Sequence, residues 1–131
     1  MIEYKVKVNE YGTKEWYLNG KFHREDGPAC EWDNGSKFWY LNGKFHREDG
    51  PAVELASGTK YWYLNGKLHR EDGPACEWGN GDKSWYLNGN LHREDEWKKK
   101  IKKTHNIIID GKEIELSDES YKNLKKAFDN Q

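Results

Sequence analysis

The chain has 131 residues, and 22 Lys and Arg against 23 Asp and Glu leave a formal net charge of −1. One domain is the prior expectation at this length, and a mean hydropathy of −1.21 argues against a thick apolar core. The apolar material is mainly 7 Trp, 8 Tyr and 4 Phe. Aromatic side chains bury much area per residue, and disordered chains are poor in them. We therefore expect an ordered protein with a thin, aromatic core.

Neither a membrane span nor an export signal is apparent in the sequence. No stretch approaches the ~20 apolar residues that a membrane-spanning helix needs. The first eight residues, MIEYKVKV, lack the apolar segment of a signal peptide. The two cysteines fit a reducing compartment. We therefore expect a soluble, cytoplasmic protein without a membrane partner.

A repeat of 23 residues organises most of the chain. Trp16, Trp39, Trp62 and Trp85 begin the runs WYLNGKFHRED, WYLNGKFHRED, WYLNGKLHRED and WYLNGNLHRED. The first three runs continue with Gly-Pro-Ala, whereas Glu96-Trp97 follows the fourth. The periodicity predicts a repeat domain over residues 1–95, with four copies and a starter strand within residues 4–15, and a different C-terminal domain over residues 96–131.

Each repeat carries two turn signals. Asn-Gly pairs, which favour the type I′ turn of a β-hairpin, stand at Asn19-Gly20 and at each 23-residue interval after it. A second glycine recurs with the same period, at Gly12, Gly35, Gly58 and Gly81. Alternation along residues 37–41 predicts Trp39 and Leu41 on one face and Phe38 and Tyr40 on the other. The fold class is therefore mainly β, an antiparallel β-hairpin array stacked as a meander or solenoid.

Residues 96–131 do not follow the 23-residue repeat. Residues 94–103 fit a short helix or an irregular cap, and residues 106–116 fit a hairpin around Asp110-Gly111. Ser117 is a good N-cap for a helix over Asp118–Asp129, with a stripe of Tyr121, Leu124, Ala127 and Phe128. We predict a small ββα cap that covers the open end of the repeat sheet.

The run WYLNGKxHREDGPA over residues 4–95 resembles MORN-like repeats of bacterial and bacteriophage proteins. The resemblance implies a twisted β-hairpin array that serves as a binding or scaffolding surface. The usual glycine after the histidine is Arg-Glu-Asp here, so lipid or kinase associations are not carried over. If the chain is encoded by a phage, the resemblance implies action in the host cytoplasm as an anti-defence inhibitor, for example an anti-CRISPR.

The HRED element is the first candidate for chemistry. A histidine beside carboxylates can be a general base or a metal ligand. The element occurs four times, from His23, His46, His69 and His92, whereas an active site needs one unique constellation. Successive copies should lie roughly 10 Å apart, at ~4.8 Å per strand, too far for one metal ion. We predict a structural role, with each arginine pairing with a carboxylate of the neighbouring unit, and no metal or cofactor.

The two cysteines and a lysine cluster are further candidates for function. Cys30 and Cys76 occupy one repeat position with Val53 between them, and should lie roughly 20 Å apart, which predicts buried thiols and no disulfide. A lysine cluster could grip phosphate or could be a solvated face, with Trp97 and Ile101 tucked inward. The cluster comprises Lys98, Lys99, Lys100, Lys102 and Lys103.

No Walker loop, GxSxG, HExxH, CxxC or EF-hand pattern is present, so we expect no enzyme. The first hypothesis is a protein-interaction module that binds a protein or a protein–nucleic-acid complex, such as a bacterial defence nuclease, by occlusion or acidic mimicry. An acidic ridge would contact a basic channel: Glu25, Asp26, Glu48, Asp49, Glu71, Asp72, Glu94 and Asp95. An aromatic face is the other candidate surface: Tyr17, Tyr40, Tyr63 and Tyr86.

The alternatives are a nucleic-acid binder that uses the lysine cluster and a hydrolase that uses a single HRED set. A homodimer through the open sheet edge at Tyr4–Val8 is a further expectation.

Overall fold

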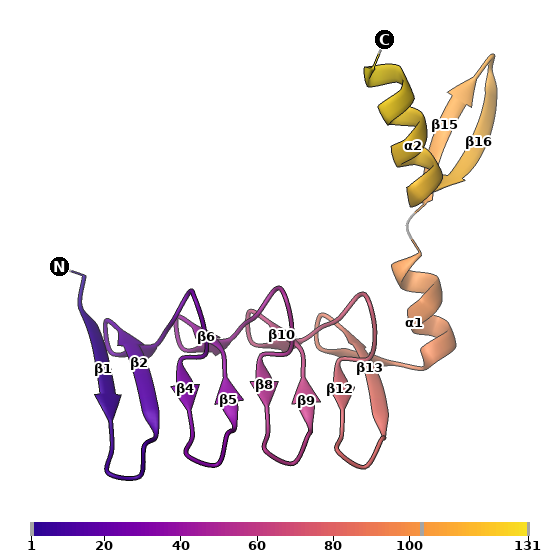
Figure 1. Cartoon of the computed structure of the whole chain (residues 1–131). Coiled ribbons are helices and arrows are strands. Elements are labelled where there is room, and N and C mark those ends of the chain that lie inside the picture. The colour runs from indigo at the N-terminus through magenta and orange to yellow at the C-terminus, as the bar shows by residue number, and fades with distance from the viewer. Residues whose placement is uncertain (1, 103, 131) are drawn as a thin grey trace. The chain divides into compact units, whose positions relative to one another are not determined.

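The computed structural model describes residues 2–102 and 104–130, and the chain divides into two units, Met1–Glu94 and Asp95–Gln131. The first unit contains a 10-stranded sheet whose described strands pair antiparallel (Figure 1). Its strands follow the order β1-β2-β4-β5-β8-β9-β12-β13-β14, with β3 paired to β2. Their bounds are Tyr4–Val8 (β1), Lys14–Leu18 (β2), Lys21–Phe22 (β3), Cys30–Glu31 (β4), Lys37–Phe38 (β5), Val53–Glu54 (β8), Lys60–Tyr61 (β9), Cys76–Glu77 (β12), Lys83–Leu87 (β13) and Asn90–His92 (β14).

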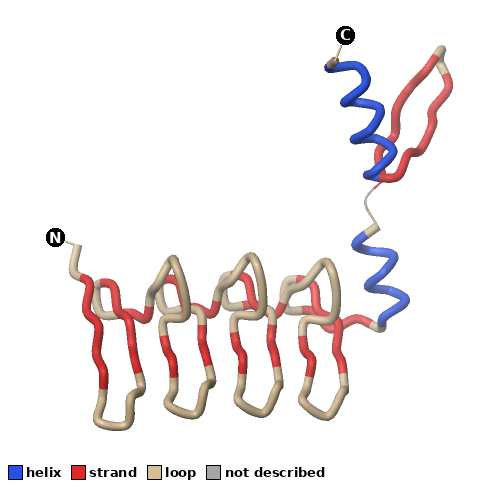
Figure 2. Tube along the Cα trace, viewed as in Figure 1, coloured by secondary structure: helices blue, strands red, loops and turns tan. Residues whose placement is uncertain are grey.

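Two short hairpins stand beside this sheet. The first joins β6 (Tyr40–Leu41) to β7 (Lys44–Phe45), and the second joins β10 (Tyr63–Leu64) to β11 (Lys67–Leu68). Neighbouring hairpins are connected through backbone bonds, since the Gly43 and Gly66 N–H groups donate to the Phe22 and Phe45 carbonyls. Figure 2 shows how short these strands are and how much loop separates them. The prediction of a mainly β chain of antiparallel hairpins, with a small helical part at the C-terminus, is confirmed.

The strand expected over residues 37–41 is interrupted at Trp39, which is a correction to the predicted meander. The Trp39 N–H donates to the Ala52 carbonyl at 2.7 Å, and the Phe38 carbonyl accepts from the Ala29 N–H at 2.8 Å. Trp39 therefore belongs to neither β5 nor β6, and the chain passes there from the long sheet to a hairpin. We call the successive hairpins at the Asn-Gly turns, β2–β3, β6–β7, β10–β11 and β13–β14, the hairpin row. Trp39 and Leu41 still lie on a different face from Tyr40, as predicted. Tyr40 stacks on Phe22, while Trp39 and Leu41 line a cleft that is described below.

The Asn-Gly turns have the backbone that the sequence predicts. Asn19 and Gly20 have φ of 49° and 80°, and the three equivalent pairs are alike. Both central residues of a type I′ turn need positive φ, which Asn and Gly tolerate best. The hairpin row is thus encoded locally, by the dipeptide that recurs in every unit.

The interior of the first unit is thin. Ala29, Ala52 and Ala75 are fully buried, and the residues that follow them, Cys30, Val53 and Cys76, are nearly so. The hairpin row adds aromatic stacking along its length, from Tyr17 through Phe22, Tyr40 and Phe45 to Tyr63, with centroid distances of 4.4–5.1 Å. Small residues in the ladder and stacked rings in the hairpins together replace a conventional aliphatic core.

The second unit holds most of α1 (Glu94–Ile101), then β15 (Thr104–Ile109), β16 (Lys112–Ser117) and α2 (Asp118–Asp129). The Ser117 Oγ accepts from the Ser120 N–H at 3.1 Å, so the predicted N-cap, hairpin and helix are confirmed. Tyr121 and Leu124 are half-buried, but Ala127 and Phe128 are exposed, so only the first half of the predicted stripe is covered. That this unit covers the end of the repeat sheet stays a prediction.

Candidate partner-binding clefts

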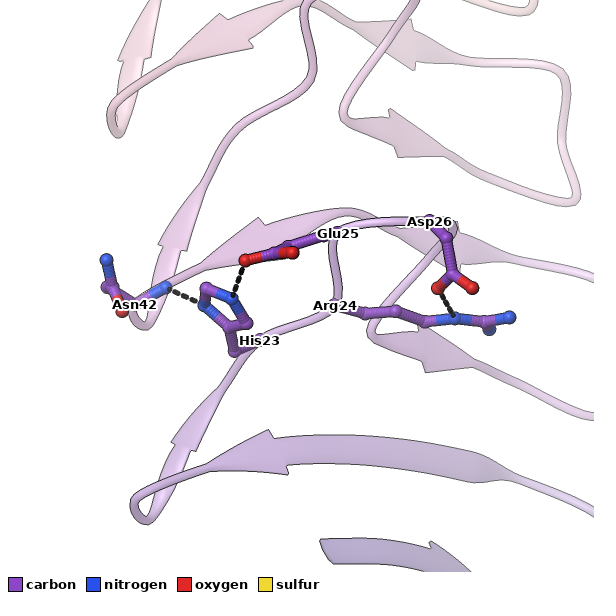
Figure 3. Close-up of polar contacts among 5 residues, drawn as sticks. All are labelled: His23, Arg24, Glu25, Asp26 and Asn42. Carbon is purple, nitrogen blue, oxygen red and sulfur yellow. Dashed lines mark hydrogen bonds and ion pairs between the residues drawn. The ribbon is translucent and has the colours of Figure 1, made fainter. Parts of the chain in front are cut away.

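The histidine of each of the first three HRED elements connects its unit to the next one. The Nδ1 atom of His23 accepts a hydrogen bond from the Asn42 N–H at 2.9 Å, and Nε2 lies 3.4 Å from Glu25 Oε1 (Figure 3). His46 and His69 accept from the Asn65 and Asn88 N–H groups in the same way. Because a backbone N–H can only donate, Nδ1 carries no proton, and the proton of the neutral ring is on Nε2. These three histidines are structural links between units.

The arginine side chains of the first three elements bond within their own units. The guanidinium carbon of Arg47 lies 3.9 Å from the centroid of the Trp39 ring, and Nε donates to Asp49 Oδ1 at 3.0 Å. Its Nη1 donates to the Pro51 carbonyl and to Glu54. Arg24 and Arg70 stack on Trp16 and Trp62 with equivalent aspartate and proline bonds. The prediction that each arginine pairs with the neighbouring unit is therefore wrong for the contacts described.

The arginine also explains the glycine that follows each of the first three HRED runs. A Cβ atom at Gly50 would lie 2.8 Å from the Arg47 guanidinium carbon, and Gly27 and Gly73 have equivalent contacts. The guanidinium is thus packed between an indole ring and a glycine. We did not predict this arrangement from the sequence, although the constant spacing of Trp, Arg and Gly carries its signal.

The carboxyl groups of Asp26 and Asp49 have a pKa below the ordinary value for aspartate. The hydrogen bond and the charge of Arg24 lower the pKa of Asp26, and Arg47 does the same to the pKa of Asp49. Both side chains are highly exposed despite these bonds. Each therefore presents a carboxylate to solvent while it anchors its arginine.

Two open clefts lie between successive units. The first, of about 670 Å³, is bounded by residues 24–28 of one unit and by Trp39, Leu41 and residues 46–49 of the next. The second, of about 560 Å³, repeats this lining one unit further along, with Trp62 and Leu64. The two clefts share residues 47–49, so they form one continuous, periodic surface. We call them the inter-unit clefts.

The inter-unit clefts carry negative charge. Each is lined by four carboxylates and two arginines, an excess of two negative charges while the histidine ring is neutral. Arg47 already donates to Asp49, Glu54 and the Pro51 carbonyl, whereas Glu48 is 84% exposed. The exposed carboxylates can therefore contact a ligand, whereas the arginines are already engaged in hydrogen bonds within the protein. This difference favours a cationic ligand over an anionic one.

The predicted acidic ridge is regular over three of its four pairs. Glu25-Asp26, Glu48-Asp49 and Glu71-Asp72 lie in equivalent bends beside the clefts. Glu94 and Asp95 instead stand in the first turn of α1, because Glu96-Trp97 replaces the Gly-Pro that bends the other copies. The fourth pair therefore differs in local structure from the rest of the ridge.

The predicted aromatic face takes part in the stacking of the hairpin row. Tyr40 lies between Phe22 and Phe45, and Tyr17 stacks on Phe22. The Tyr17 hydroxyl donates to Glu15 at 2.6 Å, and this bond raises the pKa of Tyr17 to about 12. Burial raises the pKa of Tyr40 and of Tyr63, and Tyr86 is half-buried. These rings stabilise the sheet, and partner binding through them stays a prediction.

The cysteines are buried thiols, as predicted. Cys30 and Cys76 are both free and buried, and burial raises the pKa of each to about 11. Neither thiol is therefore prepared for nucleophilic attack at neutral pH, because the reactive species is the thiolate.

The lysine cluster is solvent-exposed over its described part. Lys98, Lys99 and Lys100 lie in the last turn of α1, and Lys102 follows the helix. Lys103 lies outside the described residues. Trp97 is buried and Ile101 half-buried, in agreement with the predicted inward spacing. Contact of the cluster with nucleic acid stays a prediction.

His105 has more partners than its isolated place in the sequence indicates. Its ring stacks on Tyr121 at 3.9 Å, and Nε2 lies 2.7 Å from Asp118 Oδ1. The hydrogen bonds that Asp118 makes with His105 and Lys122 lower the pKa of Asp118. Over residues 2–102 and 104–130, no group of three or more His, Cys, Asp or Glu residues is placed to hold a metal ion.

Comparisons with known proteins give no relatives. No protein-family model, no curated protein and no solved structure matches the chain. Within the described residues, none of the helices has the length and apolarity to cross a lipid bilayer.

Proposed function

We propose that residues 1–95 form a MORN-like, solenoid-type interaction module without enzymatic activity, and that its inter-unit clefts bind a basic segment of a partner protein. The observation that carries the proposal is the recurrence of one cleft at two successive junctions, with the same tryptophan, leucine, arginine and carboxylate lining. A recurring site suits a ligand that is itself periodic, and its excess of carboxylates suits cationic side chains.

The spacing of the clefts indicates the form of the ligand. Each unit contributes two strands to the long sheet, so successive clefts should lie about 9.6 Å apart at ~4.8 Å per strand. An extended polyproline II segment advances about 9.3 Å in three residues. A partner segment with Lys or Arg at every third position would therefore present one cation to each cleft, with its aliphatic stem along the indole ring.

Titrations with labelled peptides test this proposal. A peptide with Lys at every third position should bind more tightly than an isomer with its lysines clustered at one end, and added salt should weaken both complexes. If the isomers bind equally, the periodic match is wrong. If neither binds, the proposed function is wrong.

A charge-neutralising variant identifies the surface. Changing Glu25, Glu48 and Glu71 to Gln leaves the arginine–aspartate pairs intact and should lower the affinity about tenfold or more. The matched control changes three exposed glutamates outside the clefts, Glu10, Glu113 and Glu115, to Gln. Equal losses from both triple variants would show that net charge and not the clefts determines binding.

The anti-defence role that the resemblance implies is one biological role in which the clefts would bind a basic partner. A basic nucleic-acid channel of a bacterial defence nuclease has the cationic surface that the clefts require. The protein should then lower DNA cleavage by such a nuclease, and the triple glutamine variant should restore cleavage. Undiminished cleavage by a panel of CRISPR nucleases would count against this role but not against the interaction module.

Nucleic-acid binding through the lysine cluster is the second candidate, because Lys98, Lys99, Lys100 and Lys102 are all exposed. Alanine at these positions and at Lys103 should then abolish retention on heparin and flatten its dependence on salt. Unchanged retention would rule this candidate out.

A further inference from the structure

The outer edge of β1 has unpaired backbone groups. The Glu3 carbonyl accepts from the Asn19 N–H at 2.8 Å, and the Asn9 N–H donates to the Thr13 carbonyl at 3.1 Å. Odd-numbered residues at both ends of β1 therefore face β2. Because backbone direction alternates along an antiparallel strand, the N–H and C=O groups of Tyr4, Val6 and Val8 face away from β2. Among the described residues, no strand pairs with that side of β1.

The inner units show what fits such an edge. Val6 is equivalent to Ala29, 23 residues later in the repeat. The Ala29 carbonyl accepts from the Trp16 N–H of the preceding unit, and Ala29 is fully buried, whereas Val6 is 56% exposed. The edge that an antiparallel neighbour covers in the interior of the sheet is thus uncovered at β1.

The side chains of β1 add an apolar row on one face. Tyr4 and Val6 lie opposite Leu18 and Trp16, so they share the face of these two residues. Ile2, Tyr4, Val6 and Val8 are all large and exposed. The opposite face carries Glu3, Lys5 and Lys7, and Glu3 pairs with Lys5 at 3.0 Å. A bare edge with a one-sided apolar row is a template for another strand.

We propose that β1 pairs antiparallel with β1 of a second copy of this chain, which joins the two sheets through a two-fold axis at Lys5. In this register Tyr4 opposes Val6 of the second copy and Ile2 opposes Val8, so apolar side chains meet and outward backbone groups bond. Glu3 opposes Lys7 twice, which forms opposite-charge pairs. Lys5 opposes its own copy once, at the axis. The alternative centred on Val6 sets Lys5 against Lys7 twice and Glu3 against Asn9, so it has more like-charge pairs and no opposite-charge pair.

This interface is independent of the inter-unit clefts, since none of these residues lines them. Sedimentation of the full chain at increasing concentration should show the mass doubling. Proline at Val6 removes an N–H that does not face β2, so it should abolish the dimer and preserve the fold, as checked by circular dichroism and thermal unfolding. A wild-type chain that stays monomeric at high concentration would overturn the proposal.

A charge exchange tests the register and does not depend on the proline variant. Glu3→Lys alone should weaken association about tenfold, because it places like charges opposite each other at two sites. Glu3→Lys combined with Lys7→Glu should restore association, since the opposite-charge pairs return in reversed polarity. Failure of the double variant to recover would overturn the register centred on Lys5.

Cross-linking gives a direct geometric readout. Lys5 lies on the two-fold axis in a non-hydrogen-bonded pair, where Cα atoms are ~4.5 Å apart and a disulfide can form. Lys5→Cys should therefore form a covalent dimer under mild oxidation, whereas Lys7→Cys should not. The buried Cys30 and Cys76 make the wild type the oxidation control. Equal cross-linking of the two variants, or none in Lys5→Cys, would contradict the proposed pairing.

Discussion

The Nδ1 atom of His46 accepts a hydrogen bond from the backbone N–H of Asn65, 2.9 Å away and 19 residues later, in the next unit. The histidine is 12% exposed, and the asparagine begins the Asn-Gly turn of the following hairpin. One side chain thus fixes the position of the neighbouring turn, and the same bond recurs from His23 and His69. The histidine of HRED is therefore one of the groups that hold one unit against the next, beside the backbone bonds between them.

The hydrogen bond between His46 and Asn65 should contribute to the free energy of unfolding. His46→Ala leaves the Asn65 N–H without its acceptor and should lower the free energy of unfolding by about 1–3 kcal/mol, measured by urea denaturation. His46→Asn should lose less, because its amide oxygen can accept in place of Nδ1. The control is His92→Ala, because His92 stands in the last copy and no Asn-Gly turn of a fifth unit follows it. If His46→Ala and His92→Ala have the same effect, the inter-unit bond contributes nothing.

The stacking of Arg47 on Trp39 predicts a dependence between Arg47 and Gly50. Arg47→Ala should destabilise the protein by about 2 kcal/mol through the lost cation–π contact and the lost hydrogen bonds. Gly50→Ala alone should cost about 1 kcal/mol or more, because its Cβ displaces the guanidinium. In the Arg47→Ala background the same change should cost much less, since no guanidinium is left to clash with. Additive losses in thermal or urea unfolding would contradict this packing.

The stacked rings of the hairpin row should tolerate leucine at Phe22 better than alanine. Phe22 stacks between Tyr17 and Tyr40, and the equivalent position in the third unit is Leu68. Phe22→Leu should therefore cost about 1 kcal/mol, whereas Phe22→Ala should cost about 3 kcal/mol, because it removes contacts on both sides. Near-ultraviolet circular dichroism should report the loss of tyrosine packing in Phe22→Ala. Equal stability of the two variants would argue against stacking as a source of stability.

The buried thiols predict protection from alkylation and a loss of stability at high pH. Cys30 and Cys76 should react with a thiol reagent only after denaturation, as followed by mass spectrometry. Burial raises the pKa of each from 9.0 to about 11, so the folded state holds the proton more tightly than the unfolded state. Their contribution to stability is therefore complete below pH 9.0 and declines as the pH rises toward 11. Rapid labelling of the folded protein would contradict this burial.

Cys30→Val is the matched control for the pH dependence, because Val53 occupies the same position in the second unit. The variant should fold and should lose less stability between pH 9.0 and 11 than the wild type. A pH profile identical to that of the wild type would show that another group is responsible.

The features read correctly from the sequence are those that depend on a few neighbouring residues. The Asn-Gly pairs require positive φ wherever they stand, and Ser117 caps α2 through a residue three positions away. The exposure of Phe128 was not predictable in this way, because the stripe of α2 shows only which side chains share a face. Whether that face is covered depends on which parts of β15 and β16 the helix contacts in the fold.

At the candidate site, the carboxylate partners of the arginines could likewise not be predicted from neighbouring residues alone. Arg47 has several acidic residues within reach, and the sequence does not distinguish Asp49 and Glu54 of its own unit from carboxylates of the next. In the fold the guanidinium lies on the Trp39 ring and donates to the Pro51 carbonyl, so its partners belong to its own unit. The inter-unit clefts follow from that arrangement, and so they could not be predicted either.

By itself the sequence determined the 23-residue unit, its turns, the buried cysteine position and the hairpin and helix at the C-terminus, because periodicity and turn chemistry act over short distances. Only the tertiary structure decided that the strand expected over residues 37–41 breaks at Trp39, that the side chain of His23 bonds to the next unit and that the side chain of Arg47 bonds within its own. These outcomes depend on which groups meet when one unit stacks on another. Stacking brings together residues about twenty positions apart, and directional hydrogen bonds then select among partners that are chemically equivalent in the sequence.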